Sequence, residues 1–189
     1  KFEDYRLCDI WRNVKFKIDL KYSKIKDVSM LGKVYSLNLS CCDNITDVSI
    51  LGNVHILNLC WCNNITDVSM LGKVHTLILF GCKKITDVLI LEKSQHQKWH
   101  CHTLDLSWCK KITDVSMLEN VYSLNLCGCP NITDVSMLGN LHTLDLYGCS
   151  NITDVSMLEK VHTLNLLNCS NIPKYQMEEL KKTVKNLRY

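Results

Sequence analysis

The chain has 189 residues, a formal net charge of +3, 47% hydrophobic residues and 22% charged residues. This composition excludes disorder as the main state, and the length suffices to bury a core without crosslinks. No apolar run approaches the roughly 18 residues that a membrane-spanning helix needs, so no membrane association is expected. The opening segment lacks the long apolar stretch of a secretory signal. The small positive charge gives weak support to nucleic-acid binding, so a nucleic-acid partner is not expected.

The chain begins with a predicted cap segment, residues 1–13. Phe2, Tyr5, Cys8 and Trp11 recur there at helical spacing, which indicates that this segment covers one end of the molecule. Residues 14–33 follow as one irregular rung of a repeat. The residues of this rung that are expected to point inward are Ile18, Leu20, Ile25, Val28 and Leu31.

A repeat with a period of 20 residues governs residues 34–172, and a seven-residue insertion, 94–100, breaks the spacing once. Within a rung, Leu144 and Leu146 alternate with polar neighbours, which predicts a short β-strand. The next apolar residues, such as Cys149 and Ile152, fall three apart, which indicates tight turns. One rung cannot bury its own leucines, so the rungs are expected to stack. The seven regular rungs are marked by Ile45, Ile65, Ile85, Ile112, Ile132, Ile152 and Ile172.

Residues 173–189 are predicted to form a helix that caps the other end. Pro173 suits the first position of a helix, where its missing N–H is not needed. Apolar residues then recur on one face, and lysines follow glutamates in the direction that the helix dipole favours. The residues of the apolar face are Met177, Leu180, Val184 and Leu187. The predicted organisation is therefore a cap segment 1–13, a solenoid 14–172 and a capping helix 173–189.

The repeat carries the pattern L-x-x-L-x-L-x-x-C-x-x-I-T-D over residues 34–172, and this pattern resembles the leucine-rich-repeat family. The Cys-x-x-Ile-Thr-Asp part resembles the cysteine-containing subtype that is common in F-box ubiquitin-ligase receptors, and Ile-Thr-Asp-Val-Ser resembles internalin repeats. The resemblance implies an α/β fold, a leucine-rich-repeat solenoid with a parallel β-sheet on its concave side. Rungs of 20 residues leave room only for short convex turns, whereas the cysteine-containing subtype has longer rungs with a helix there.

Equivalent residues of stacked parallel strands form ladders about 4.8 Å apart. A ladder of cysteines admits a disulfide or metal interpretation and a structural one, in which a small buried thiol lies where the strand turns. We favour the structural interpretation, because the position belongs to the apolar repeat and the resembling family uses it in this way. Reduced thiols then indicate an intracellular, cytoplasmic protein. The ladder consists of Cys42, Cys62, Cys82, Cys109, Cys129, Cys149 and Cys169.

Two further ladders carry polar groups. Aspartates are expected to accept backbone N–H groups and cap the next turn, and histidines with two tyrosines are expected to stack. A catalytic site needs unlike groups at one place, whereas a ladder repeats one group, so no catalytic residue, no cofactor and no enzymatic activity are predicted. The ladders are Asp27, Asp47, Asp67, Asp87, Asp114, Asp134 and Asp154, and Tyr35, His55, His75, His102, Tyr122, His142 and His162.

The columns of residues that point outward from the strands are mostly small and polar, so departures from them are informative. Large apolar side chains depart from this pattern mainly in three consecutive rungs, and they predict an exposed patch that binds a partner protein. The alternative is that Trp61 and Trp108 only cover the rim of the solenoid. The candidate partner-binding residues are Ile56, Trp61, Ile78, Phe80, Trp99, Trp108 and Tyr147.

A local cluster of lysines occupies matching positions on two neighbouring rungs of a nearly neutral chain. The cluster predicts a site for an anion or an acidic partner, and the alternative is a solvated rim. The lysines are Lys83, Lys84, Lys110 and Lys111. The insertion contains His96 and His100, which are possible metal ligands. No fourth ligand lies at a suitable spacing, so no metal site is predicted.

These features predict a non-enzymatic protein-interaction scaffold that binds a partner protein through the concave face of the solenoid. A rigid sheet presents preorganised side chains, so little conformational entropy is lost on docking. A narrower alternative is the substrate-recognition part of an F-box-type ubiquitin-ligase receptor, because Cys8-x-x-Trp11 resembles the final helix of an F-box. An ice-binding solenoid is disfavoured, because the Thr/Ser column is flanked by mixed residues.

Overall fold

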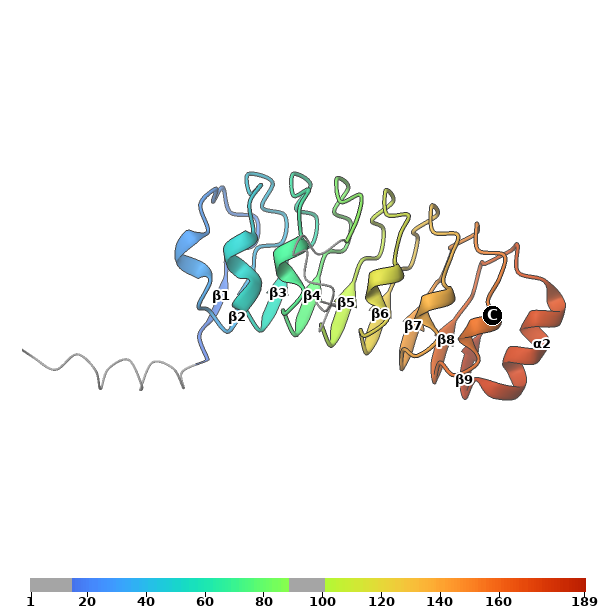
Figure 1. Cartoon of the computed structure of the whole chain (residues 1–189). Helices are drawn as coiled ribbons and strands as arrows, with labels where there is room; N and C mark the ends of the chain where they lie inside the picture. The colour runs from blue at the N-terminus through green and yellow to red at the C-terminus, as the bar shows by residue number, and fades with distance from the viewer. Residues whose placement is uncertain (1–14, 89–100) are drawn as a thin grey trace, which may run out of the picture.

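A computed structural model describes residues 15–88 and 101–189 (Figure 1). The predicted cap segment 1–13 and the insertion 94–100, with Trp99, His96 and His100, lie outside the described residues. In the described part, nine strands form one parallel sheet in sequence order. The strands are β1 Lys17–Asp19, β2 Ser36–Asn38, β3 Ile56–Asn58, β4 Thr76–Ile78, β5 Thr103–Asp105, β6 Ser123–Asn125, β7 Thr143–Asp145, β8 Thr163–Asn165 and β9 Asn186–Arg188.

Strands β1, β2, β3, β5, β6 and β7 are each followed by a tight turn and then by a short 3-10 helix that returns the chain to the next strand. The sheet register sets the central leucines directly beside one another, as in Leu57 beside Leu77 and Leu77 beside Leu104. The fold is therefore the α/β leucine-rich-repeat solenoid that the sequence predicts, with short turns opposite the sheet. The 3-10 helices are η1 Ser29–Leu31, η2 Ser49–Asn53, η3 Ser69–Leu71, η4 Ser116–Leu118, η5 Ser136–Leu138 and η6 Ser156–Leu158.

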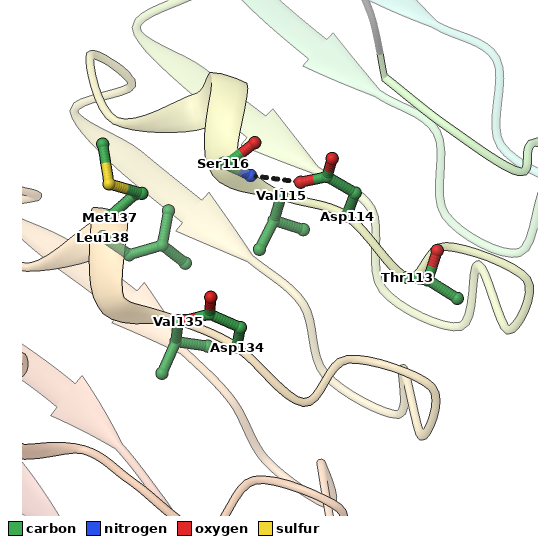
Figure 2. A pocket seen from close by; sticks show the side chains of 8 residues that line it. All are labelled: Thr113, Asp114, Val115, Ser116, Asp134, Val135, Met137 and Leu138. Atoms are coloured by element: carbon green, nitrogen blue, oxygen red, sulfur yellow. Dashed lines mark hydrogen bonds between the residues drawn. The ribbon is translucent and has the colours of Figure 1, made fainter.

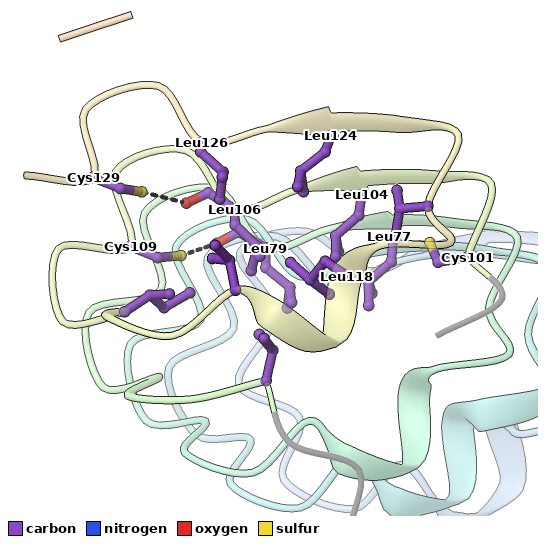
Figure 3. Packing of buried hydrophobic residues seen from close by; sticks show 14 of the residues in the cluster. Leu77, Leu79, Cys101, Leu104, Leu106, Cys109, Leu118, Leu124, Leu126 and Cys129 are labelled. Atoms are coloured by element: carbon purple, nitrogen blue, oxygen red, sulfur yellow. Dashed lines mark hydrogen bonds between the residues drawn. The ribbon is translucent and has the colours of Figure 1, made fainter. Parts of the chain in front are cut away.

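The core is a column of identical layers between the sheet and the 3-10 turns (Figure 3). The rungs of β2, β3, β5, β6 and β7 each contribute two strand leucines, a cysteine, an isoleucine, a valine and a turn leucine, and these side chains are buried. Burying one leucine stabilises the fold by roughly 1.5–3 kcal/mol, so each layer contributes several such increments. In the irregular first rung, Val28 is buried, whereas Ile18, Leu20, Ile25 and Leu31 pack against the core while partly exposed.

The cysteine ladder lies inside this core. Each ladder thiol donates a hydrogen bond to the carbonyl oxygen of a leucine in the preceding rung, as from Cys109 Sγ to Leu79 O at 3.1 Å and from Cys129 Sγ to Leu106 O at 3.2 Å (Figure 3). Burial raises the pKa of the Cys129 thiol to about 12. The eleven cysteines that the structure describes are free thiols, which agrees with the structural interpretation.

The aspartate ladder caps the 3-10 turns, as predicted. Asp114 Oδ1 accepts the N–H of Ser116 at 2.9 Å, and Asp134 does the same for Ser136 at 2.8 Å. This backbone hydrogen bond lowers the pKa of Asp114 below its ordinary value. The aspartates thus form hydrogen bonds within their own rung, and these bonds stabilise the turn.

The C-terminal cap is built differently from the predicted single helix over 173–189. Helix α2 covers only Lys174–Thr183, and the chain then forms β9, which pairs with β8. Leu187 therefore enters the cap from a strand, beside Leu164, because the sequence Val-Lys-Asn-Leu repeats the alternation that begins each rung. Helix α2 is fastened by Gln176, which accepts the N–H of Val155 at 2.8 Å and donates to Asp154 at 3.0 Å.

Within the described ranges, no helix is both long and apolar enough to cross a membrane.

Candidate functional site

Four of the predicted partner-binding residues meet on the outward side of β3 and β4. The register sets Ile56 beside Thr76 and Asn58 beside Ile78, so the two isoleucines are diagonal neighbours. Phe80 follows β4, and its ring meets the ring of Trp61 edge to face, with 5.3 Å between centroids. Ile56, Ile78 and Phe80 are half-buried and Trp61 is exposed, so together they form one apolar surface, which we name the apolar patch.

Ile78 replaces a residue with a repeated structural role. In other rungs this column holds Asn or Asp, whose side-chain oxygen accepts the N–H of the residue two places on. Asn58 accepts the N–H of Cys60 at 2.9 Å, and Asn125 accepts that of Cys127 at 3.0 Å. Ile78 has no acceptor, so the β4 rung gives up this hydrogen bond in exchange for an apolar side chain.

Trp61 and Trp108 occupy a position where the backbone is left-handed in every described rung, which we name the rim position. Its φ angle is +58° at Trp61 and +60° at Trp108, close to the +70° at Gly81 and Gly148. The left-handed conformation costs a residue other than glycine roughly 1–2 kcal/mol. Glycine is therefore the residue that the backbone favours, and tryptophan is not demanded by the fold.

The glycines at the rim position accommodate the tryptophan rings of the preceding rung. A Cβ on Gly81 would lie 2.8 Å from the Trp61 ring, and a Cβ on Gly128 would lie 3.1 Å from the Trp108 ring. Each indole thus rests on the next glycine, while 38% of Trp61 and 43% of Trp108 stay exposed. The tryptophans do cover the rim, as the alternative interpretation holds, but a large part of each ring remains open to a partner.

Two of the four predicted lysines, Lys83 and Lys110, lie beside these tryptophans. Lys83 Nζ is 5.5 Å from the centroid of the Trp61 ring, and Lys110 Nζ is 5.3 Å from that of Trp108. At such distances an ammonium group is attracted to the face of the ring. The structure thus joins two groups of residues that the sequence treats separately, the aromatic residues of the rim and the lysines of the following loops.

Lys84 and Lys111 also replace a residue with a structural role. The other regular rungs carry asparagine at this position, and each asparagine Nδ2 donates to a loop carbonyl oxygen of the preceding rung at 2.7–3.2 Å. Lysine cannot repeat this contact in the same geometry, and Lys84 Nζ instead donates to Asn64 Oδ1 at 2.7 Å. The members of this asparagine ladder are Asn44, Asn64, Asn131, Asn151 and Asn171.

Two of the predicted partner-binding residues are not part of the apolar patch. Tyr147 follows β7, three strands from Phe80, and its hydroxyl accepts a hydrogen bond from Asn168 Nδ2 at 2.8 Å. Trp99 lies outside the described residues. Trp108 follows β5, so its ring lies next to the patch along the rim.

The predicted ring ladder is continuous. Neighbouring rings from Tyr35 to His162 stack with centroids 4.4–4.9 Å apart. In four of the histidines Nδ1 is 3.2 Å from the hydroxyl of the threonine that follows, as in His142 and Thr143. The imidazoles therefore face one another as stacked planes. In the part of the chain that the structure describes, no group of His, Cys, Asp and Glu could hold a metal ion.

Hollows on the opposite side of the solenoid repeat with the rungs. One of them is lined by Thr113–Ser116 of one rung and by Asp134, Val135, Met137 and Leu138 of the next (Figure 2). Equivalent grooves lie between two other pairs of rungs, with the same residue types. Because the lining is the repeat itself, these grooves follow from stacking and distinguish no part of the chain.

Three features were not predicted from the sequence: the left-handed rim, the asparagine ladder and a row of exposed methionines on the 3-10 turns. The first two had a signal, because glycine recurs at the rim position and asparagine recurs before the isoleucine of most rungs. The methionine row includes Met30, 90% exposed, and Met157, 61% exposed. Since it runs along nearly all the turns, we assign it no partner.

A family model described as Leucine Rich repeat matches residues 102–119. No curated protein sequence matches the chain. Among solved structures, an internalin of Listeria monocytogenes, InlF, matches with a TM-score of 0.62 and 22% identity over 94% of this chain and 61% of its own. Internalin C2 of the same species matches with a TM-score of 0.40 and 25% identity, over 77% of this chain and 62% of its own. The functional domain of InlJ, which includes a cysteine ladder, gives 0.31 and 17%, over 94% and 53%.

The chain therefore has the leucine-rich-repeat fold, and one of its rungs matches the Leucine Rich repeat family model. It spans less than two thirds of the length of the internalin chains that it resembles. The likeness to InlF concerns the fold, in which stacked rungs present one parallel sheet. It carries no residue of the apolar patch over from one protein to the other.

Proposed function

We propose that the chain is a non-enzymatic protein-interaction scaffold that binds a partner protein through the apolar patch on the concave face. Its leucine-rich-repeat fold supports a scaffold role, since such proteins generally bind other proteins. One observation carries the proposal: in the rungs of β3, β4 and β5 the chain gives up repeated structural interactions and gains outward apolar and aromatic side chains.

The energetic argument follows from that exchange. Trp61 and Trp108 hold a backbone conformation that glycine adopts more readily, and Ile78 lacks the acceptor that other rungs have. Neither change improves the solenoid by itself. Tryptophan is enriched at the centres of protein interfaces, and a rigid sheet loses little entropy when a partner docks. The same side chains that weaken the repeat are therefore suited to bind a protein.

The test uses residues that the chain itself carries elsewhere. Ile56→Thr, Ile78→Asn and Phe80→Ser bring these positions to the residues of neighbouring rungs, so this patch variant keeps the fold. A control variant, Thr143→Ser, Asp145→Asn and Leu167→Ser, changes the same columns in the last rungs. In affinity capture from the native cell with quantitative mass spectrometry, wild type and control should retain a partner that the patch variant loses. If the patch variant retains the same proteins at equal melting temperature, the patch is not the binding site.

A reducing, cytoplasmic location is part of the proposal. It is supported by the free, buried thiols of the cysteine ladder, for example Cys62, whose pKa burial raises to about 12. Thiol titration of denatured protein from its native cell should find every cysteine reduced, and a stable disulfide in that protein would contradict the location. The F-box alternative depends on Cys8 and Trp11, which lie outside the described residues, and it stays a prediction.

A further inference from the structure

The edge of the sheet beside the apolar patch carries alternating indole rings and ammonium groups over three neighbouring rungs. We name its members the Trp–Lys edge: Trp61, Lys83, Lys84, Trp108, Lys110 and Lys111. We propose that the Trp–Lys edge is a binding site for a short, extended, acidic segment of a protein. This proposal rests on the proposed function in that the partner is a protein, and it adds the chemistry of the segment that is bound.

The geometry supplies matched binding groups at the spacing of the rungs. Lys83 Nζ lies 5.5 Å from the centre of the Trp61 ring, and Lys110 Nζ lies 5.3 Å from that of Trp108. Cation–π attraction holds each ammonium close to a ring, so these two lysines are partly ordered before a ligand arrives. Neighbouring parallel strands are about 4.8 Å apart, so an extended peptide that crosses the rungs meets a ring or an ammonium group at each one.

The charge of the edge is not neutralised within the described structure. In residues 15–88 and 101–189 the ion pairs join Lys181 with Glu178 and Lys182 with Glu179, all in α2. The carboxylate of Asp43, in the loop of the β2 rung, accepts hydrogen bonds from the N–H and Nδ2 of Asn63. Four exposed ammonium groups therefore stand without a carboxylate in ion-pair contact, and an anionic ligand complements them.

The lysines stand where the solenoid itself favours asparagine. In the later rungs Asn131, Asn151 and Asn171 each donate to a carbonyl oxygen of the preceding loop at 2.8 Å. Lys84 and Lys111 interrupt that ladder in the β4 and β5 rungs, and tryptophan takes the rim position in the neighbouring β3 and β5 rungs. Two independent structural preferences are thus given up at one edge, and each replacement adds a group that binds an acidic, partly aromatic segment.

The size of the basic region favours a peptide over a nucleic acid. Lysine pairs occur in two neighbouring loops only, and the loops on either side carry Asp43 and Asn63 or Pro130 and Ser150. A single-stranded nucleic acid places a phosphate at every nucleotide and is bound by a longer basic groove. Two or three carboxylates suffice to occupy the four lysines, and an aromatic side chain between them can stack on an exposed indole face.

The experiment uses the full chain and a short fluorescent peptide in which glutamate and tyrosine alternate. The edge variant, Lys83→Ser, Lys84→Asn, Lys110→Ser and Lys111→Asn, carries the residues that Ser150 and Asn151 show to be compatible with the fold. Wild type should bind the peptide more weakly as salt rises, and the edge variant should bind about tenfold more weakly or worse. The patch variant Ile56→Thr, Ile78→Asn, Phe80→Ser keeps the four lysines and should bind the peptide within about threefold of wild type.

Two controls decide the outcome. A peptide in which serine replaces glutamate should not bind, and fluorescent oligothymidylate should bind more weakly than the acidic peptide. Equal peptide binding by wild type and edge variant overturns the proposal, and so does tighter binding of oligothymidylate, which would assign the edge to nucleic acid. Loss of the captured partner from the patch variant alone, with peptide binding unchanged, would keep the proposed function and separate it from the edge.

Discussion

The rungs of β3–β5 and those of β6–β8 have the same interior and different exteriors. In both regions the strand leucines, the ladder cysteines and the leucines of the described 3-10 turns are buried, and each thiol donates to the equivalent leucine carbonyl oxygen of the preceding rung. Outside, the β6 and β7 rungs keep Gly128 and Gly148 at the rim, and the later rungs keep asparagines in the ladder. Tryptophan instead holds the rim of the β3 and β5 rungs, and lysine holds the ladder position of the β4 and β5 rungs. The interior therefore explains the fold of both regions, and it does not explain the exterior of β3–β5, for which we propose partner binding.

The comparison first predicts that the two interiors are equally stabilising. Leu104→Ala and Leu144→Ala each remove a buried strand leucine, and each should lower the free energy of unfolding by about 2–5 kcal/mol. Denaturant unfolding followed by circular dichroism measures both. A loss at Leu104 that is smaller by more than about 1 kcal/mol would mean that the β3–β5 region is packed less well, and the two interiors would no longer be equivalent.

A smaller difference in stability is expected when a glycine of each region is replaced by alanine. Gly81 and Gly148 both have a φ of +70°, but a Cβ at Gly81 would lie 2.8 Å from the Trp61 ring, and one at Gly148 meets nothing within 4 Å. Gly148→Ala should cost about 1 kcal/mol from the left-handed backbone alone. Gly81→Ala should cost more, roughly 2–3 kcal/mol, because the indole must also move. Equal losses in thermal unfolding would show that Trp61 does not rest on Gly81.

Most of the fold follows from the sequence, because the same inward residues recur in every rung. The alternation at Leu144 and Leu146 predicts the strand, and the aspartate ladder predicts the cap of each turn, which Asp134 and Ser136 show. The end of the chain was harder to predict. Leu187 lies at a helical spacing from Leu180 and also at a strand position after Val184, and only pairing with β8 decides between them.

The candidate site was predictable in part. Unusual outward residues are visible in a repeat, so Ile78, Phe80 and the tryptophans could be singled out. Their meeting point could not be derived, because it depends on side-chain directions, such as that which brings Lys83 over Trp61. Nor does the sequence state that the rim backbone is left-handed, although Gly81, Gly128 and Gly148 carry that signal. Side-chain contacts between rungs that the repeat pattern does not require can be read only from the structure.

A third prediction tests whether the lysines weaken the earlier rungs. Lys84→Asn and Lys111→Asn should restore the asparagine ladder, and each should stabilise the chain by about 0.5–1 kcal/mol. Asn131→Lys, the reverse change in a later rung, should destabilise it by a similar amount because the bond to Lys110 O is lost. The midpoints of urea unfolding at constant m-value report all three. A destabilising effect of the two asparagine substitutions would show that lysine is the better structural residue there.

The smallest predicted effect concerns the ring ladder, whose two halves differ in histidine content. His75 lies between His55 and His102 with centroids 4.4 and 4.9 Å away, whereas His142 lies between Tyr122 and His162. Burial, and then the two neighbouring histidines, lower the pKa of His75 below its ordinary value of 6.5. At acidic pH the unfolded chain then binds more protons than the folded chain. The free energy of unfolding is therefore highest above the ordinary pKa of histidine, and it decreases as the pH drops through the lowered pKa of His75.

His75→Tyr should therefore flatten the fall in melting temperature between about pH 7.5 and pH 5, because tyrosine keeps the stack, as at Tyr35 and Tyr122, without titrating in that range. His162→Tyr is the matched change in the other half, where desolvation and a single histidine neighbour, His142, with Lys185 lower the pKa. Because His75 has a histidine on both sides and His162 has a histidine on one side only, replacement of His75 should flatten the profile more. If both substitutions leave the profile of wild type unchanged, the ring ladder is not the source of the fall between pH 7.5 and pH 5. The capping aspartates are not that source either, because their pKa is lowered from 3.8 and their loss of stability therefore occurs at more acidic pH.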